Sequence, residues 1–299
     1  MFSKKRFITE NIPDLTGKVA IVTGGNAGLG YITARELTRK NAHVFIASRN
    51  KERGEGAVEK IKKETGKNQV EYLYLELANL KTVKQSAENF LSKNLPLHIL
   101  INNAGIINPC SLTEDGIPNI FGVNHVGHFL FTMTLLDNLE ASAPSRIVNV
   151  SSVAHIYTDG IEFDKINQEA DSFWQSYCKS KLSNILFTES LSKRLEGKEV
   201  YVNSIHPGFV ETKLSKWDDS WILTKMVINI ALWFSMSPDD GALTQLYAAT
   251  SPEIIEKNYR NQYFVPFGEI GEKSEAAQDG KLAEKLWKYT KDLIDAKLR

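Results

Sequence analysis

The stretch TGGNAGLG, residues 23–30, decides the fold. It follows the apolar run KVAIVT (residues 18–23) and precedes GLGYITARELTRK (residues 28–40), whose apolar residues recur with helical spacing. Gly24, Gly28 and Gly30 permit a tight turn and let the backbone approach a pyrophosphate at the start of the helix. Such glycines also suit an ordinary turn, so the strand–turn–helix context near the start of the chain carries the interpretation.

Further apolar runs alternate with longer amphipathic segments along the chain. The expected strands are residues 43–48, 70–75, 98–102, 146–151 and 200–205, and the expected helices are residues 51–63, 80–92, 117–139 and 173–195. This alternation predicts an α/β fold, a doubly wound parallel sheet with helices on both faces. No linker divides the chain, so we predict a single domain over residues 18–299, preceded by an arm of residues 1–17.

The composition excludes several classes of protein. The 299 residues include 36 Lys+Arg and 36 Asp+Glu, so there is no net positive charge with which to bind nucleic acid. Two cysteines, Cys110 and Cys178, provide no disulfide framework and no metal cluster, which favours a reducing compartment. The start of the chain lacks the apolar segment of a secretory signal, and the apolar run 226–236 is far shorter than the ~20 residues that span a bilayer. We expect a cytoplasmic protein.

Two strand ends carry further signals for a dinucleotide. An NAD site places an acidic residue after the second strand, to bind the ribose 2′-hydroxyl. This chain has Ser48-Arg49-Asn50 there, and Arg49 would pair with a 2′-phosphate, which favours NADP(H) and leaves NAD as the alternative. INNAG (residues 101–105) ends the fourth predicted strand with small residues, which would let a dinucleotide lie close. If the segment is instead an ordinary loop, its two asparagine side chains would form hydrogen bonds with the backbone of the turn.

The segment YCKSK, residues 177–181, holds a candidate acid–base pair. Tyr177 and Lys181 are four residues apart, which places them on one face of a helix. A tyrosine has a pKa of about 10, and a neighbouring ammonium group would lower it towards neutrality by stabilising the phenolate. The fifth predicted strand ends in NVSS, so a hydroxyl of Ser151 or Ser152 would donate to a substrate carbonyl beside the tyrosine.

Together these motifs resemble the short-chain dehydrogenase/reductase family. TGGNAGLG, INNAG, FGVNHVGHF, RIVNVSSVAH, YCKSK and HPGFVET occur in the family's order, and the match runs from about Gly17 to Thr250. NHVGHF, SSVAH, YCKSKLSNILF and SPDDGALTQLYAATSPE are most similar to the retinol-dehydrogenase and WW-domain-oxidoreductase-like branch. The resemblance implies a Rossmann fold and, after the sixth strand, a lid over the substrate at about residues 213–236.

The resemblance also assigns a role to individual residues. Tyr177 would exchange the proton, Lys181 would lower its pKa and bind the nicotinamide ribose, Ser152 would polarise the substrate oxygen, and Asn124 would hold a water that links Lys181 to solvent. The remaining implied cofactor contacts are Gly24, Asn26, Gly28, Leu29, Gly30, Arg49, Glu76, Leu77, Asn103, Ala104, Gly105, Pro207, Gly208, Val210 and Thr212. Two departures bear on the choice of cofactor. Glu76-Leu77 stands where the family usually has Asp before Leu or Val, and Ala27 stands where NADP enzymes often have a basic residue.

Three other features have both a functional and a purely structural interpretation. His125 and His128 form an H-x-x-H pair, but no carboxylate or cysteine cluster accompanies them, so we predict no metal. Cys178, beside Tyr177, is interpreted as a packing residue rather than a redox-sensitive thiol. The apolar segment 217–236 is interpreted as the lid, with contact to a membrane surface, contact to a partner and plain core as the alternatives.

The sequence therefore predicts an NAD(P)-dependent oxidoreductase that prefers NADP(H) and interconverts a lipophilic alcohol and its aldehyde or ketone. Peripheral membrane contact and a homodimer through the helices of Tyr177 and its predecessor are further expectations. One alternative is a catalytically silent NADP(H)-binding sensor or scaffold, which would not need the Ser–Tyr–Lys set. Another is a sugar-nucleotide epimerase or dehydratase, against which INNAG and the short part after Thr212 argue.

Overall fold

A computed structural model describes residues 6–107, 111–164, 166, 172–208 and 236–299. Within them an eight-stranded sheet has the order β3-β2-β1-β4-β5-β6-β7-β8, in which all neighbours run parallel except the antiparallel pair β7 and β8. The strands are β1 (Val19–Thr23), β2 (His43–Ser48), β3 (Val70–Tyr74), β4 (Ile99–Asn102), β5 (Ser145–Val150), β6 (Val200–Ile205), β7 (Tyr263–Val265) and β8 (Glu269–Ile270). The predicted α/β class and parallel sheet are confirmed.

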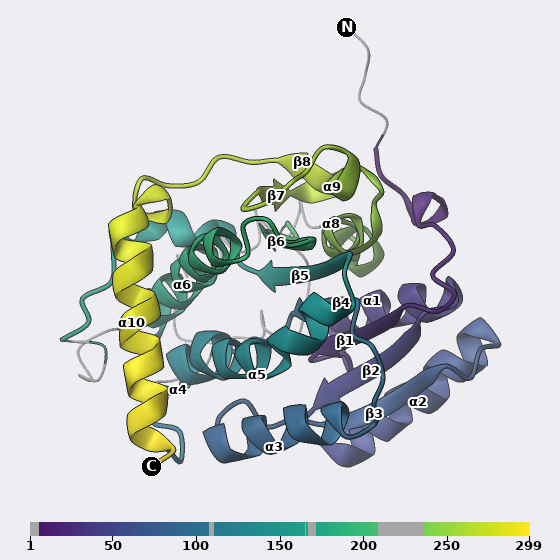
Figure 1. Cartoon of the computed structure of the whole chain (residues 1–299), viewed down its shortest axis with the longest axis horizontal. Helices are drawn as coiled ribbons and strands as arrows, with labels where there is room; N and C mark the ends of the chain where they lie inside the picture. Colours follow the sequence, from purple (N-terminus) through teal and green to yellow (C-terminus); the bar gives the residue numbers. More distant parts are fainter. Residues whose placement is uncertain (1–5, 108–110, 165, 167–171, 209–235) are drawn as a thin grey trace, which may run out of the picture.

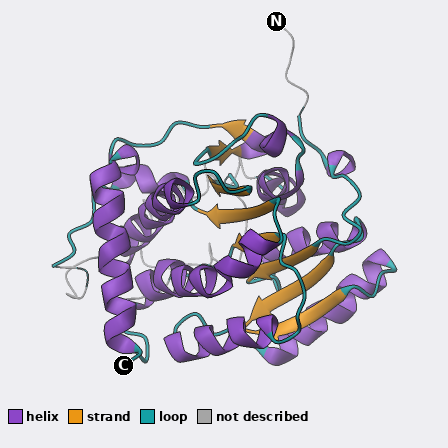
Figure 2. Cartoon of the chain, in the orientation of Figure 1, coloured by secondary structure: helices purple, strands orange, loops and turns teal. Residues whose placement is uncertain are grey.

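Helices cover both faces of this sheet (Figures 1 and 2). The longer ones are α1 (Gly28–Arg39), α2 (Lys51–Thr65), α3 (Leu80–Leu91), α5 (Gly127–Ala141), α6 (Phe173–Arg194), α8 (Pro238–Thr250) and α10 (Gly280–Lys297). Short turns of helix are η1 (Thr9–Asn11), α4 (Asn119–Phe121), η2 (Gly122–Val126), η3 (Val153–Tyr157), α9 (Glu253–Glu256), η5 (Pro266–Gly268) and η6 (Ala276–Gln278). None of the described helices is both long and apolar enough to cross a membrane.

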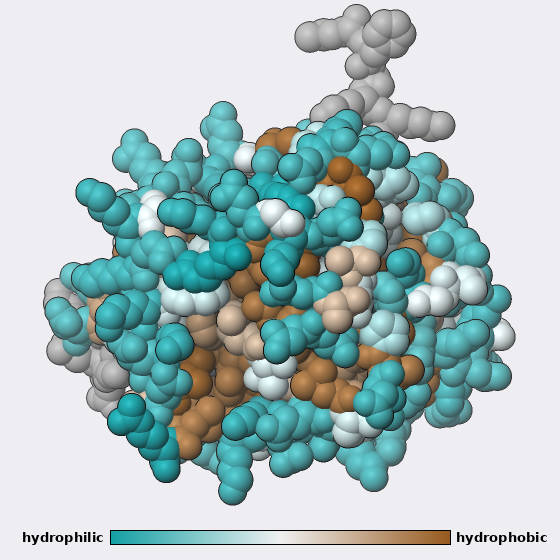
Figure 3. Space-filling view, in the orientation of Figure 1, coloured by the Kyte–Doolittle hydropathy of each residue, from teal (hydrophilic) through white to brown (hydrophobic). Residues whose placement is uncertain are grey.

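Helices pack on both faces of the sheet, so the strands are buried on both sides and an apolar core lies on each face. One core joins α3, α5, α6 and α10 to the sheet, and the other joins α1, α2 and α8. The leading arm belongs to the second core through Phe7, Ile12 and Leu15, and its Arg6 guanidinium lies 3.6 Å from the centre of the Phe267 ring. The described part of the arm, residues 6–17, is therefore packed onto the fold. On the face seen in Figure 3, hydrophilic side chains cover most of the surface.

The C-terminal helix α10 packs across α5 and α6. The ring of Trp287 lies 4.8 Å from that of Phe129 on α5 and 6.0 Å from that of Phe187 on α6. The Arg194 guanidinium stacks over the same indole at 3.9 Å and forms an ion pair with Glu284. This packing holds two helices in place: α5, which directly follows the turn that contains Asn124, and α6, which carries Tyr177.

The predicted helix over residues 117–139 departs from regular geometry. It consists of α4, then the π turn η2, then α5. A π turn inserts one residue into a helix and is frequent at functional sites. Asn124 lies at the middle of this turn and is fully buried.

Candidate active site

The strand order reverses between β1 and β4, and most of the predicted site residues follow the carboxyl ends of the strands. In doubly wound sheets, ligands bind at the carboxyl ends of the strands, at the point where the connections after two neighbouring strands go to opposite faces of the sheet. TGGNAGLG follows β1 and INNAG follows β4, and β1 pairs directly with β4. The structure therefore brings the two predicted cofactor motifs together.

The glycine turn and the INNAG segment are in close contact. A Cβ at Gly30 would lie 2.5 Å from Asn103 Nδ2 and from the Gly24 carbonyl oxygen, so only glycine fits there. Gly28 has φ +55° and nothing within 4 Å of a Cβ, so it faces open space where α1 begins. No side chain caps this end of α1, so its first backbone N–H groups are available to an anion.

The hydroxyl of Thr23, at the end of β1, fixes the INNAG segment. Thr23 Oγ1 accepts hydrogen bonds from the backbone N–H groups of Asn103 and Ala104, each at 2.9 Å. It also lies 2.8 Å from His128 Nε2, and His128 Nδ1 lies 3.2 Å from the Asn124 carbonyl oxygen. Because that carbonyl only accepts, Nδ1 carries the proton and Nε2 accepts from the Thr23 hydroxyl.

Asn124 joins Ile106, the residue directly after the INNAG segment, to α6, the helix that carries Tyr177 and Lys181. Its Oδ1 accepts from Ile106 N–H at 2.8 Å, and its Nδ2 donates to the Ile106 carbonyl and to Ser180 Oγ, both at 3.0 Å. Ser180 Oγ in turn donates to the Tyr177 carbonyl at 2.8 Å. The buried amide thus has three protein partners, and its predicted role in holding a water stays a prediction.

Three contacts bind α6 to the end of β5. Ser151 Oγ donates to the Lys181 carbonyl at 2.7 Å, while Lys181 Nζ and Asn184 Nδ2 both donate to the Val150 carbonyl at 3.1 Å. The Ser151 hydroxyl is therefore engaged in holding the helix, and the Ser152 hydroxyl is the one that hydrogen-bonds to the Tyr177 hydroxyl. The NVSS motif alone left the two serines open, the family resemblance named Ser152, and the structure gives the two hydroxyls different partners.

Ser152, Tyr177 and Lys181 form one cluster. Lys181 Nζ lies 5.5 Å from the centre of the Tyr177 ring. Burial raises the pKa of Tyr177 to about 12, partly offset by the hydrogen bond from Ser152. Burial also lowers the pKa of Lys181 to about 8. Without a bound cofactor, Tyr177 is therefore a phenol at neutral pH, and the lowered pKa expected from Lys181 is not found.

The remaining predicted contacts lie around this edge of the sheet. Arg49 is exposed directly after β2. The Glu76 carboxylate accepts a hydrogen bond from Ala78 N–H at 3.1 Å, and Leu77 is buried against Gly127. Asn26 and Leu29 are half-buried in the glycine turn.

Residues after β6 are described only in part. Pro207 and Gly208 follow the strand, and Gly208 has φ +90°. A Cβ at Gly208 would lie 2.6 Å from the sulfur of Met236. Val210, Thr212 and the predicted lid up to residue 235 lie outside the described residues.

The two histidines of the H-x-x-H pair have separate partners. His125 Nε2 lies 3.0 Å from Thr290 Oγ1 on α10, whereas His128 bonds to Thr23 and Asn124. Burial lowers the pKa of His125 to about 3 and that of His128 to about 4, so both are neutral. Within the described ranges, no three His, Cys, Asp or Glu side chains gather where a metal could bind.

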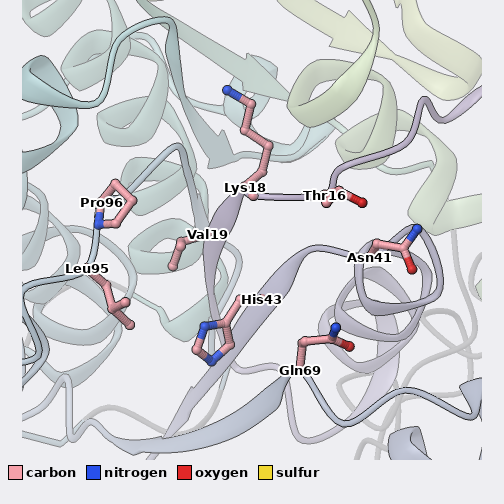
Figure 4. Close-up of a pocket in the computed structure, with 9 residues that line it drawn as sticks. Thr16, Lys18, Val19, Asn41, His43, Gln69, Leu95 and Pro96 are labelled. Carbon is pink, nitrogen blue, oxygen red and sulfur yellow. The ribbon is translucent and has the colours of Figure 1, made fainter.

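A separate cavity of about 460 Å³ lies at the opposite edge of the sheet. Figure 4 shows its lining, which includes Lys18, Asn41, His43 and Gln69. These residues are at or before the amino ends of β1, β2 and β3. The cavity is therefore distinct from the predicted site.

Sequence reasoning missed several side chains that hold the site together. In the sequence, Thr23, Ser180 and His155 stand out only as letters of longer motifs, and Asn184 carries no signal of its own. The H-x-x-H spacing of His128 points only to a metal ligand. A polar residue at the end of an apolar strand, or within one of the motifs, was the one available sign of a structural hydrogen bond. The sequence does not reveal its partners, because they come from distant parts of the chain.

Comparison with known proteins agrees with this geometry. The family described as short chain dehydrogenase matches residues 18–222. Retinol dehydrogenase 11 of Homo sapiens is 40% identical over 94% of this chain and 86% of that protein, and retinol dehydrogenase 14 of Homo sapiens is 40% identical over 93% and 86%. An uncharacterized oxidoreductase of Schizosaccharomyces pombe is 38% identical over 95% and 87%.

A solved structure also resembles the whole chain. It is an uncharacterized protein from Mycobacterium paratuberculosis with TM-score 0.80 and 31% identity, covering 97% of this chain and 98% of that one. The chain belongs to the short-chain dehydrogenase family, in its retinol-dehydrogenase-like branch. It is accordingly an oxidoreductase that uses a nicotinamide cofactor and acts on a small molecule.

The central place of Thr23 can be tested by removing its hydroxyl alone. Thr23→Val keeps the shape but leaves the N–H groups of Asn103 and Ala104 without their acceptor, so we expect a loss of about 1–3 kcal/mol in the free energy of unfolding and weaker cofactor binding. Denaturant unfolding and cofactor titration measure the two effects.

Thr38→Val is the matched control, because this buried hydroxyl donates to the Ala34 carbonyl within α1 and, among the described residues, has no bond to another element. It should lose less stability and keep cofactor affinity. Equal losses in both variants would contradict the special role of Thr23.

Proposed function

We propose that this protein interconverts a lipophilic alcohol and its aldehyde or ketone, with NADP(H) as the preferred cofactor and Tyr177 as the proton donor and acceptor. One observation carries the proposal. The Ser152 hydroxyl bonds to the Tyr177 phenol, and the Lys181 ammonium group lies beside the phenol ring, all at the edge of the sheet where the glycine turn opens.

The residues present fit a dinucleotide. Among the described residues no side chain caps the start of α1, and Gly28 has open space beside it, which suits a pyrophosphate. Arg49 supports NADP(H), because it is exposed at the end of β2 and, in the described part of the chain, no ion pair involves its guanidinium. Asn26, Leu29, Glu76 and Leu77 would line the adenosine half. Gly105, Pro207, Gly208, Val210 and Thr212 would line the rest.

The chain's own residues would control the proton. When bound, the nicotinamide ring supplies or accepts the hydride. In reduction, the hydroxyls of Ser152 and Tyr177 donate hydrogen bonds to the substrate oxygen, and Tyr177 then gives its proton to the alkoxide. Lys181, oriented by the Val150 carbonyl, stabilises the phenolate that remains. Asn124 would hold the water through which the proton is replaced.

Exposed apolar side chains beside this cluster support a lipophilic substrate. Ile156, Tyr157 and Trp174 are 47%, 57% and 40% exposed, although large apolar residues are usually buried. The Tyr157 and Trp174 rings are 6.0 Å apart, and Trp174 stacks on Tyr177 at 6.1 Å. A row of aromatic rings therefore leads from the surface to the proton donor, and an apolar substrate would cover it.

Two other expectations from the sequence stay predictions. A homodimer would use α5 and α6, across which α10 packs in this structure. Contact with a membrane surface would involve the segment 226–236, nearly all of which lies outside the described residues.

Replacing the proton donor tests the mechanism. Tyr177→Phe should keep cofactor affinity but lower turnover of NADPH with a panel of retinoid, steroid and aliphatic carbonyls by at least about 10²-fold. Tyr74→Phe, which changes an exposed tyrosine on β3, is the matched control and should behave as wild type. Near-normal turnover in Tyr177→Phe would rule out the proposed role.

Charge reversal at Arg49 tests the cofactor preference. Arg49→Glu should lower kcat/KM for NADPH relative to NADH by about 10- to 100-fold, because a charge-assisted contact is replaced by repulsion. Arg299→Glu makes the same change in net charge at the end of the chain and should leave the ratio unchanged. An unaltered ratio in Arg49→Glu would remove Arg49 from the cofactor site.

A further inference from the structure

His155 is a buried residue directly behind the candidate catalytic serine. It is 1% exposed and belongs to η3, the short helix that Ser152 caps by accepting a hydrogen bond from Ala154 N–H at 3.2 Å. Its Nδ1 lies 2.8 Å from the Ser152 carbonyl oxygen. Its Nε2 lies 3.3 Å from the backbone nitrogen of Ser274, in the segment that links β8 to α10.

The two contacts determine the state of the ring. The Ser152 carbonyl can only accept, so Nδ1 carries the proton, and the Ser274 N–H can only donate, so Nε2 is the acceptor. Both bonds exist together only in the neutral Nδ1–H tautomer. Burial lowers the pKa of His155, which is consistent with a neutral ring.

The ring also has a fixed position among its neighbours. It packs edge-on against Tyr263 of β7, with the ring centres 4.9 Å apart, and Tyr263 is itself close enough to Tyr177 to interact with it electrostatically. In the described part of the chain, His206 and Lys273 are the other ionisable groups that interact with His155. Cys178, Lys181 and Tyr263 are those near Tyr177. His155 thus lies between the catalytic cluster and the C-terminal part of the sheet.

We propose that His155 is a positioning residue, which holds the backbone of Ser152 so that its hydroxyl points to Tyr177 and ties this geometry to the docking of the segment around Ser274. The inference rests on the proposed function, in which Ser152 and Tyr177 act on the same oxygen. Since the Ser152 hydroxyl lowers the pKa of Tyr177, a displaced Ser152 would raise that pKa as well as slow turnover.

Two substitutions separate the two bonds of the ring. The amide nitrogen of asparagine is as many bonds from Cβ as Nδ1, so His155→Asn retains a donor for the Ser152 carbonyl and loses the acceptor for Ser274. The amide oxygen of glutamine is as many bonds from Cβ as Nε2, so His155→Gln retains the acceptor and loses the donor. Both remove the ring that packs on Tyr263, so each controls for lost packing in the other.

The activity test compares these variants with wild type in both directions. His155→Gln should lower kcat about tenfold or more, leave KM for the cofactor unchanged, and displace the pH profile of alcohol oxidation to higher pH. His155→Asn should retain most of kcat and the wild-type profile. Equal losses in both variants, or a wild-type kcat and profile in His155→Gln, would overturn the proposal.

A spectroscopic readout keeps this test separate from the proposed function. In the ¹⁵N-labelled full chain at about pH 8, the His155 ring should give the signals of a neutral Nδ1–H tautomer, and its pKa should lie below the usual value of about 6.5 because the ring is buried. An Nε2–H tautomer, or a pKa at or above about 6.5, would overturn the inference about His155, whatever the activity. Absence of any turnover in wild type, with the tautomer as expected, would instead count against the proposed function.

Discussion

The buried hydroxyl of Thr23 makes the contacts on which the rest of the site depends. It accepts from two backbone N–H groups of the INNAG segment and donates to His128. Ile106, which directly follows that segment, is held to Asn124 through both of its backbone groups, and Asn124 is held to Ser180. Ser180 bonds to the carbonyl of Tyr177. One continuous set of hydrogen bonds therefore runs from the end of β1 to the residue that would exchange the proton.

These hydrogen bonds hold the site rigidly because they are buried. Thr23, Asn124 and Ser180 are fully buried, where an unpaired polar group costs about 1–3 kcal/mol. Each hydrogen bond is therefore hard to break without replacing its partner, so the carboxyl end of β1 and the helix α6 keep a fixed position relative to each other. Two buried histidines fix candidate catalytic residues in the same way: His128 donates through Nδ1 to the Asn124 carbonyl, and His155 donates through Nδ1 to the Ser152 carbonyl.

Most of the sheet could be predicted from the sequence because its strands are short, apolar and separated by helical patterns. The strands expected at residues 43–48 and 200–205 have the bounds of β2 and β6. β7 and β8 were missed, since they have three and two residues and interrupt a segment rich in Gly and Pro. The π turn at Asn124 was missed because a continuous apolar pattern carries no sign of one inserted residue.

The candidate site was predictable to the extent that its motifs are local. Tyr177, Lys181 and Ser152 could be named from helix spacing, strand position and the family resemblance, and the structure brings them together. The partners of Asn124, His128 and His155 could not be named, because they come from residues up to about 120 positions away. The pKa of Tyr177 also depends on burial, which spacing along a helix does not reveal.

The central claim is that the Tyr177 hydroxyl exchanges the proton, and the pH dependence of initial rates with NADP⁺ or NADPH tests it most directly. Because burial raises the pKa of Tyr177, the phenolate form is a minor species at neutral pH, so alcohol oxidation should accelerate as the pH rises from 6 to 8. Carbonyl reduction should be level over this range and decline above about pH 8, where Lys181 loses its proton. An oxidation rate independent of pH between 6 and 8 would contradict the account.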